Sequence, residues 1–276
     1  MINYHFHDDL SSDATQPLAL HCDAADANGA CVSICVTNHA EALDGDLTWR
    51  ADPDEMIPRF ERSAQAVKAA AARFPHLEIR LGVELEYRRE WRAAFEKLLD
   101  AVPFDFVLGS VHFVDGLNIS GGREVDEFFL PRSERDAYEA YFREVDEMVE
   151  WGNFDVVAHF DLVKRYGHRH YGHYVPNNYR SIIEPILGKM ARRGIGIEIN
   201  TSGVKEAPGC PYPEPEILEW ARQVGVDRLT LGSDSHSPET FSQGLTRGVA
   251  LAADTGWTEF TLFEERRPVR RIELSR

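Results

Sequence analysis

The chain has 276 residues, of which 43% are apolar and 28% are charged, values that are ordinary for a folded globular protein and argue against disorder. Its formal net charge of -16, without a cluster of lysines and arginines, opposes stable binding to nucleic-acid phosphates. No apolar run is long enough to cross a bilayer and no basic, apolar leader begins the sequence, so we expect a cytoplasmic protein without a membrane partner.

The first predicted strand is the short apolar run Tyr4-His5-Phe6-His7. Side chains point to alternate faces along a strand, so His5 and His7 lie on the same face and are able to bind one metal ion. Neutral imidazole is a common ligand for zinc-like metals, although two histidines on one strand face are weak support by themselves. A second predicted strand, residues 33–37, ends at Thr37-Asn38-His39.

Strands and helices alternate through the rest of the chain. A capping box begins the next helix, with Asp52 as N-cap and Pro53 in the first turn. Further strands are predicted at 78–84, 105–112, 155–159, 195–200 and 229–234, and helices at 53–74, 89–101, 134–151, 178–193, 213–224 and 238–255, with an aromatic and histidine-rich loop at 164–177 and a short pair of strands at the end. Such alternation predicts an α/β fold with a parallel sheet. Seven units without an obvious linker favour one closed barrel domain over residues 1–276.

Nearly every predicted strand ends in a side chain that binds metals well. In a parallel (β/α) barrel these ends converge on one rim, where such enzymes place their chemistry. The residues at these ends are His7, His39, Glu84, His112, His159, and Asp234 with His236 just beyond it. The sequence therefore predicts a metal site at the carboxyl ends of the strands.

The ordered motifs resemble those of the PHP family, named for its polymerase-associated and histidinol-phosphatase members, and the resemblance spans essentially the whole chain. The motifs are His5-Phe6-His7 with Ser11-Ser12-Asp13, Thr37-Asn38-His39, Gly82-Val83-Glu84, Ser110-Val111-His112, Ala158-His159 and Gly232-Ser233-Asp234-Ser235-His236. Two further segments, 161–165 and 198–203, are similar to the histidinol-phosphatase branch.

The resemblance implies a distorted, TIM-like seven-stranded (β/α) barrel with two or three divalent ions, of zinc, manganese or iron. It implies one metal on His5, His7, Glu84 and Asp234, a second on Glu84, His112 and His159, and a third on Asp13, His39 and His236. Two residues depart from the family pattern. Asp13 stands where many relatives have histidine, which favours harder metals such as manganese at the third site. Asn38 replaces an aspartate that often precedes the histidine, so the support of His39 is expected to differ.

The implied activity is hydrolysis of a phosphate monoester, in which a metal-bridging hydroxide attacks phosphorus. The residues expected to serve this catalysis are His5, His7, Glu84, His112, His159 and Asp234. Lys164 and Arg165, just beyond a strand, are candidates to hold the phosphate of a small phosphorylated metabolite; a solvated loop is the alternative. An acidic residue such as Glu86 or Asp161 is a candidate to select a substrate amine.

Histidinol phosphate, hydrolysed to histidinol and phosphate in histidine biosynthesis, is the first choice of substrate. The nearest alternative keeps the metal centre and changes the substrate to a nucleoside bisphosphate or a phosphotyrosyl protein. A third reading is a metal-binding regulatory module without turnover. The full set of ligands counts against that reading. The sequence does not fix an oligomeric state.

Overall fold

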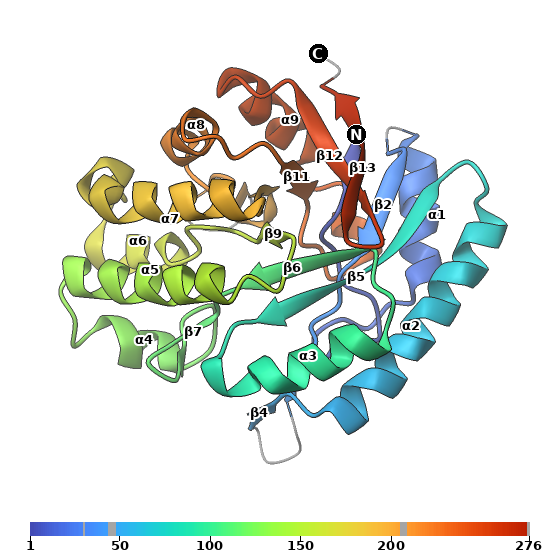
Figure 1. Ribbon diagram of the computed structural model, residues 1–276, viewed down its shortest axis with the longest axis horizontal. Coiled ribbons are helices and arrows are strands. Elements are labelled where there is room, and N and C mark those ends of the chain that lie inside the picture. The colour runs from blue at the N-terminus through green and yellow to red at the C-terminus, as the bar shows by residue number, and fades with distance from the viewer. Residues whose placement is uncertain (30, 44–47, 205–208, 275–276) are drawn as a thin grey trace.

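The computed structural model of the chain describes residues 1–29, 31–43, 48–204 and 209–274. Within these residues, one sheet contains seven strands in the order β1-β2-β5-β6-β9-β10-β11, and each neighbouring pair is parallel (Figure 1). The strands are β1 (Ile2–Asn3), β2 (Ser33–Val36), β5 (Glu78–Glu86), β6 (Phe106–Ser110), β9 (Val156–Val157), β10 (Gly196–Asn200) and β11 (Leu229–Gly232).

Backbone hydrogen bonds between the first and last strands nearly close this sheet into a barrel. Tyr4 N donates to Leu231 O at 2.8 Å, and further along the same pair of segments Asp234 N donates to His5 O at 2.7 Å. His7 N then donates to Ser235 O at 2.8 Å. The predicted α/β barrel of seven parallel strands is therefore confirmed.

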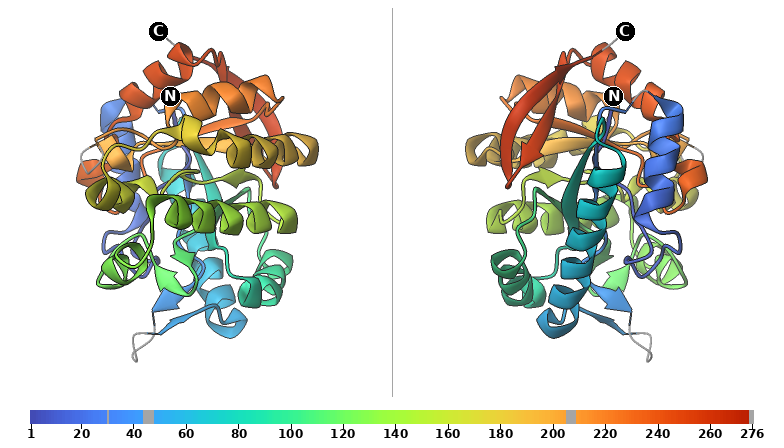
Figure 2. Two further views of the ribbon diagram at one scale, coloured as in Figure 1. Left: turned by 90° about the vertical axis from the view of Figure 1, so that its left-hand side faces the viewer. Right: turned by 90° about the vertical axis from the view of Figure 1, so that its right-hand side faces the viewer.

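Helices surround the barrel on its outside (Figure 2). They are α1 (Leu18–Asn28), α2 (Pro53–Arg73), α3 (Arg92–Ala101), α4 (Glu124–Phe129), α5 (Glu134–Trp151), α6 (Lys164–Tyr171), α7 (Arg180–Arg193), α8 (Pro215–Gln223) and α9 (Leu245–Asp254), with 3-10 turns η1 (Arg89–Trp91), η2 (Pro176–Tyr179), η3 (Ser202–Val204) and η4 (Pro238–Thr240). The predicted caps are present, because Asp52 accepts from Asp54 N and Ser133 accepts from Asp136 N. Among the described helices, none combines the length and apolar character needed to span a bilayer.

Among the described residues, three antiparallel pairs of strands accompany the barrel. They are β3 (Ala42–Leu43) with β4 (Trp49–Arg50), β7 (Phe113–Val114) with β8 (Leu117–Asn118), and β12 (Glu259–Glu264) with β13 (Arg267–Glu273). At the turn of the last hairpin, Arg266 N donates to Asp105 O at 2.9 Å and its guanidinium reaches Asp155 at 3.4 Å. Both aspartates lie just before a barrel strand, so this hairpin lies at the amino ends of the strands.

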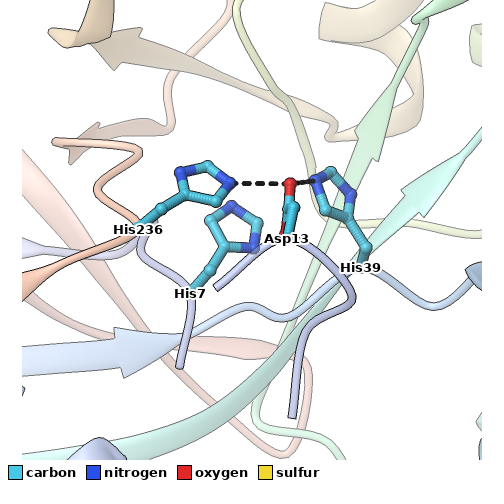
Figure 3. Close-up of side chains that lie close together, drawn as sticks. All are labelled: His7, Asp13, His39 and His236. Carbon is cyan, nitrogen blue, oxygen red and sulfur yellow. Dashed lines mark hydrogen bonds and ion pairs between the residues drawn. The ribbon is translucent and has the colours of Figure 1, made fainter. Parts of the chain in front are cut away.

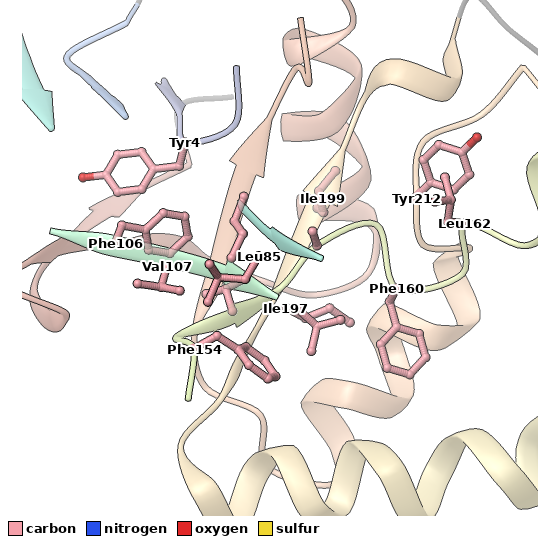
Figure 4. Close-up of a cluster of buried hydrophobic side chains, with 14 of the residues drawn as sticks. Tyr4, Leu85, Phe106, Val107, Phe154, Phe160, Leu162, Ile197, Ile199 and Tyr212 are labelled. Carbon is pink, nitrogen blue, oxygen red and sulfur yellow. The ribbon is translucent and has the colours of Figure 1, made fainter. Parts of the chain in front are cut away.

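Aromatic side chains fill the barrel beside this hairpin (Figure 4). Phe106 of β6 is fully buried, with its ring 5.3 Å from that of Tyr4 and 5.0 Å from that of Phe263. Tyr4 belongs to the first strand segment and Phe263 to β12, so one core joins both ends of the described chain. This part of the core lies towards the amino ends of the strands, and polar side chains lie at the opposite, carboxyl ends.

Helix α1 was not predicted, because a polar residue lies in its apolar stripe. Its buried residues are Leu18, His21, Cys22 and Ala25, which follow the i, i+3, i+4, i+7 spacing of an amphipathic helix. The ring of His21 stacks on Phe6 at 5.3 Å between centroids. When histidine is counted as polar, the apolar periodicity of this helix is not visible in the sequence. In the structure the packed ring of His21 completes the apolar stripe.

We expect His21 to make the stability of the protein depend on pH. Burial lowers the pKa of the ring to about 4, whereas an exposed histidine titrates near 6.5. The unfolded chain therefore takes up this proton at a higher pH than the folded one. The contribution of His21 is fully present above about pH 6.5, and about 2 to 3 kcal/mol is lost as the pH falls towards about 4.

The variant His21→Phe, which keeps a ring beside Phe6, tests this prediction. Urea unfolding at about pH 7.5 and about pH 4.5 should show a smaller loss of unfolding free energy for the variant than for the wild type. The metal ligands are present in both proteins, and most of their effect cancels in the comparison; His236 does not cancel fully, because its charge contributes to the low pKa of His21. Equal losses in the two proteins would show that His21 is not responsible.

The prediction of a loop over residues 164–177 was wrong, because α6 covers Lys164–Tyr171. This helix lacks a continuous apolar stripe and is held by tertiary contacts with α4. The ring of His170 stacks on Phe129 at 5.0 Å, and the Tyr171 hydroxyl donates to Phe129 O at 2.8 Å. The helix predicted over 238–255 is also divided, into η4 and α9, at Gly244 with a φ of 72°.

Candidate metal centre

The predicted ligands meet at the carboxyl ends of the barrel strands, around the buried carboxylate of Glu84 in β5. One oxygen of Glu84 lies 3.1 Å from His159 Nε2, and the other lies 3.1 Å from His5 Nε2. The latter oxygen is 3.3 Å from His39 Nδ1, and the former is 3.8 Å from His112 Nε2. Imidazoles from four other strand ends thus point at one carboxylate.

The charge of these rings determines the ionisation of Glu84. Burial by itself would raise the pKa of this carboxyl group. The positive charges of His5 and His39 outweigh burial and hold the pKa of Glu84 well below its usual range. The centre of the site is therefore a carboxylate anion, the form that binds metals.

A second carboxylate, that of Asp234, lies close to His5 and His7, which follow strand β1. Its Oδ1 lies 3.3 Å from His7 Nε2 and 3.5 Å from His5 Nε2. Strand β11 ends at Gly232, and Asp234 lies two residues beyond that end, after Ser233. A Cβ on Gly232 would overlap His5 and the carboxylate of Glu198, so the motif needs glycine for this close approach.

Asp13 lies between two histidines from opposite ends of the chain (Figure 3). Its Oδ2 is 2.9 Å from His236 Nε2 and 3.4 Å from His39 Nε2. The ring of His7 stacks on that of His236 at 4.2 Å between centroids. The aspartate that departs from the family pattern therefore lies beside the two histidines with which it is predicted to bind a metal, and its role as a ligand stays a prediction.

Groups of these donor atoms lie within 4.8 Å of one another, as the ligands of one ion must. The groups are His7, Asp13, His39 and His236; His5, His7 and Glu84; and His39, Glu84 and His112. His7, His39 and Glu84 each belong to two groups. This overlap suits a carboxylate shared between neighbouring ions, which is the arrangement that the resemblance implies.

The protonation of His7 supports a metal in this place. Burial, and then the charge of His236, lowers the pKa of His7 to about 3, so its ring stays neutral. Its buried Nε2 has no hydrogen-bond partner within the described part of the chain, although it faces Asp234. A neutral nitrogen aimed at carboxylates fits a divalent cation, and this mixture of imidazole and carboxylate donors suits zinc, manganese or iron.

Three buried glutamates that the ligand prediction did not include hold the histidine rings from outside. Glu198 of β10 lies 2.8 Å from His5 Nδ1, and Glu86 of β5 lies 2.8 Å from His112 Nδ1. Each bond leaves the other ring nitrogen facing Glu84. Glu41, with its side chain 3% exposed, differs from these two, because it lies 3.2 Å from His39 Nδ1, the same nitrogen that faces Glu84. Such outer carboxylates fix the orientation of ligand rings and raise their basicity.

The position of Glu86 on the same strand face as Glu84 was the available sequence signal. It suggested a carboxylate for a substrate amine, but Glu86 also accepts from the backbone N–H groups of His112 and Phe113 at 2.8 and 3.1 Å. Burial raises the pKa of Glu86 to about 7. Asp161, the other candidate for the amine, is fully buried beside Lys164. Both carboxyl groups thus already have protein partners.

The two cations proposed for phosphate have different surroundings. Lys164 is fully buried, and its ammonium donates to Pro211 O at 2.9 Å and to Glu214 at 3.0 Å. Asp161 lies 3.1 Å from the same nitrogen. Phosphate binding by Lys164 stays a prediction. Its contacts with protein groups fit a structural role better, in which Lys164 stabilises the turn after His159. Arg165 is partly exposed and packs over the ring of Tyr166.

Comparison with known proteins gives a family and several relatives. The model of the PHP domain matches residues 3–202. The chain is 29% identical over 238 residues to a probable histidinol-phosphatase of Deinococcus radiodurans, covering 85% of each protein. It is 25% identical to the histidinol-phosphatase of Lactococcus lactis, covering 95% of this chain and 94% of that protein.

Solved structures show the same fold. The crystal structure of histidinol phosphate phosphatase from Lactococcus lactis, complexed with zinc, L-histidinol and phosphate, gives a TM-score of 0.83 at 22% identity over 98% of both chains. Metal-dependent tyrosine phosphatases from Bacillus subtilis and Streptococcus pneumoniae are more distant, with a TM-score of 0.51 at 15% identity, covering 98% of this chain and 100% of theirs.

Proposed function

The chain belongs to the PHP domain family, and we propose that it is a metal-dependent phosphomonoesterase that hydrolyses histidinol phosphate to histidinol and phosphate. The convergence of the strand-end histidines and carboxylates on Glu84 is the observation that carries the phosphatase assignment. The substrate rests on the histidinol-phosphatases that match nearly the full length of the chain. We further propose that the chain acts as a single domain in the cytoplasm.

The ligand sets that we propose follow the contacts around Glu84 and Asp13. His5, His7, Glu84 and Asp234 would hold one ion, and Glu84, His112 and His159 a second. Asp13, His39 and His236 would hold the third. Divalent ions in these places supply Lewis acidity for the phosphate oxygens and a water-derived nucleophile at neutral pH.

The residues of the chain prepare the site before substrate binds. Glu198 accepts a hydrogen bond from the backbone N–H of His159 at 2.9 Å while its other oxygen contacts His5, so it holds two strand ends together. Glu86 holds the ring of His112 in the same way. Rings fixed by such bonds need no reorientation during the reaction, which lowers its free-energy barrier. Arg165 is our candidate for direct contact with phosphate.

Phosphate release across a panel of substrates tests the proposal. Metal-loaded protein would be assayed with histidinol phosphate, nucleotides including a nucleoside bisphosphate, phosphotyrosine and a generic aryl phosphate. We expect a kcat/KM for histidinol phosphate at least about a hundredfold above the others, or about 2.7 kcal/mol of transition-state discrimination.

Other outcomes separate the alternatives. Similar weak rates on all substrates would leave the metal centre and remove the histidinol assignment. A strong preference for phosphotyrosine or a nucleoside bisphosphate would replace the substrate. Metal binding without turnover of any compound would instead support a regulatory module.

A further inference from the structure

Two buried side chains next to the metal ligands form a reciprocal pair. Asp8 follows His7, Asn38 precedes His39, and both Asp8 and Asn38 are 1% exposed. Asn38 Nδ2 donates to Asp8 Oδ1 at 2.6 Å. In return, Asp8 N donates to Asn38 Oδ1 at 2.9 Å. Asn38 thus uses its amide as a donor and as an acceptor towards the same residue.

The Asp8–Asn38 pair extends the hydrogen bonding between the first two strands towards the candidate metal centre. Before it, Thr37 N donates to Phe6 O at 2.9 Å across the strands. Beyond it, the rings of His7 and His39 lie 4.6 Å apart with 24° between their planes. Asp8 Oδ1 also accepts from Leu10 N at 3.0 Å, which fixes the turn that leads to Asp13. The pair therefore lies where the backbones of three predicted ligands meet.

The chemistry of the pair requires that residues 8 and 38 are not both carboxylates. If residue 38 were an aspartate, an oxygen would replace the Nδ2 that faces Asp8 Oδ1. Two carboxylates would then lie in contact in a buried place, where their repulsion is little screened. An asparagine at residue 8 can still accept from Leu10 N and Asn38 Nδ2, so the change Asp8→Asn keeps both hydrogen bonds.

We propose that Asp8 and Asn38 are a matched pair of positioning residues that places His7 and His39 for the cluster with Asp13 and His236. A carboxylate at residue 38 is compatible with this cluster only when residue 8 is neutral. The inference rests on the proposed metal centre. It also opposes the family pattern, from which an aspartate at residue 38 would be expected to support His39.

The test is a charge swap in the full-length chain. Calorimetric titration of metal-free protein with Mn²⁺ would compare the wild type, Asn38→Asp, Asp8→Asn and the double variant. We expect Asn38→Asp to weaken the binding of at least one metal equivalent by about tenfold or more, as loss of an outer partner of a ligand does. Asp8→Asn alone should change affinity by less than about threefold. In the double variant the amide of residue 8 turns its Nδ2 to the carboxylate of residue 38 and gives up the bond from Leu10 N, so we expect it to recover at least about threefold of the lost affinity and not all of it.

Thermal melting in EDTA keeps the inference testable without metal. We expect Asn38→Asp to melt at least about 3 °C below the wild type and the double variant to recover most of that loss. Asn118→Asp is the matched control, because Asn118 uses its Oδ1 to accept from Ser120 and an aspartate can do the same. This control adds the same charge and should leave both measurements unchanged.

The pair is rejected if Asn38→Asp binds Mn²⁺ and melts like the wild type. It is also rejected if Asp8→Asn does not rescue that variant, including the case in which neither variant folds. A wild type that binds no metal would contradict the proposed function instead, and the melting comparison would still decide whether the two residues are matched.

Discussion

Glu84→Gln is expected to lower the rate of phosphate release by at least about a thousandfold, or ~4 kcal/mol, and to reduce the number of bound metal ions. The change keeps the size of the side chain and removes its charge. Glu84 belongs to two of the ligand groups, and its oxygens face His5 and His159 at 3.1 Å. A neutral amide binds divalent cations poorly and presents an N–H₂ group to one of these rings. One substitution therefore weakens two proposed sites.

Elemental analysis after dialysis, together with steady-state kinetics, measures both effects. Glu78→Gln is the matched control, because Glu78 lies at the other end of β5 and pairs at the surface with Arg270. It should keep wild-type metal content and activity. A Glu84→Gln protein with unchanged metal content would show that this carboxylate is not a shared ligand.

His159→Ala is expected to reduce phosphate release by about a thousandfold, or ~4 kcal/mol, while the fold stays largely intact. The substitution removes the imidazole that faces Glu84. It keeps the backbone N–H of residue 159 that donates to Glu198 at 2.9 Å, so the turn after β9 retains its bond to β10. The loss should therefore fall on the metal site and not on the barrel.

Circular dichroism and melting of the metal-free proteins would check the fold beside the kinetic assay. His76→Ala provides a control for the loss of an imidazole, because His76 is 63% exposed and pairs with Asp26 away from the cluster. Normal activity in His159→Ala would contradict the proposed metal centre. An unfolded variant would instead show that the ring supports the barrel.

Most of the proposed ligands could be picked out because they stand at or just beyond a strand end, and a parallel barrel brings these ends to one rim. Asp13 came only from the family resemblance. The group of His39 with Glu84 and His112 was not predicted, because the resemblance placed His39 with Asp13 and His236.

The residues behind the ligands carry a weaker signal: Glu86 shares a strand face with Glu84, and Glu198 lies in the segment 198–203. Neither signal shows which ring a carboxylate contacts. Only the packed structure places Glu41 3.2 Å from His39 and Glu198 2.8 Å from His5.

Local patterns determined most of the strands and helices and suggested the candidate ligands, because alternation, caps and motif spacing depend on near neighbours in the chain. Tertiary contacts decided the rest. Packing on Phe129 fixed α6, and the stack on Phe6 placed His21 in α1. Burial turned Lys164 inwards to Glu214, and Asp8 came to face Asn38 across 30 residues of sequence. Such pairings depend on where the folded backbone brings distant segments together, which one-dimensional periodicity does not encode.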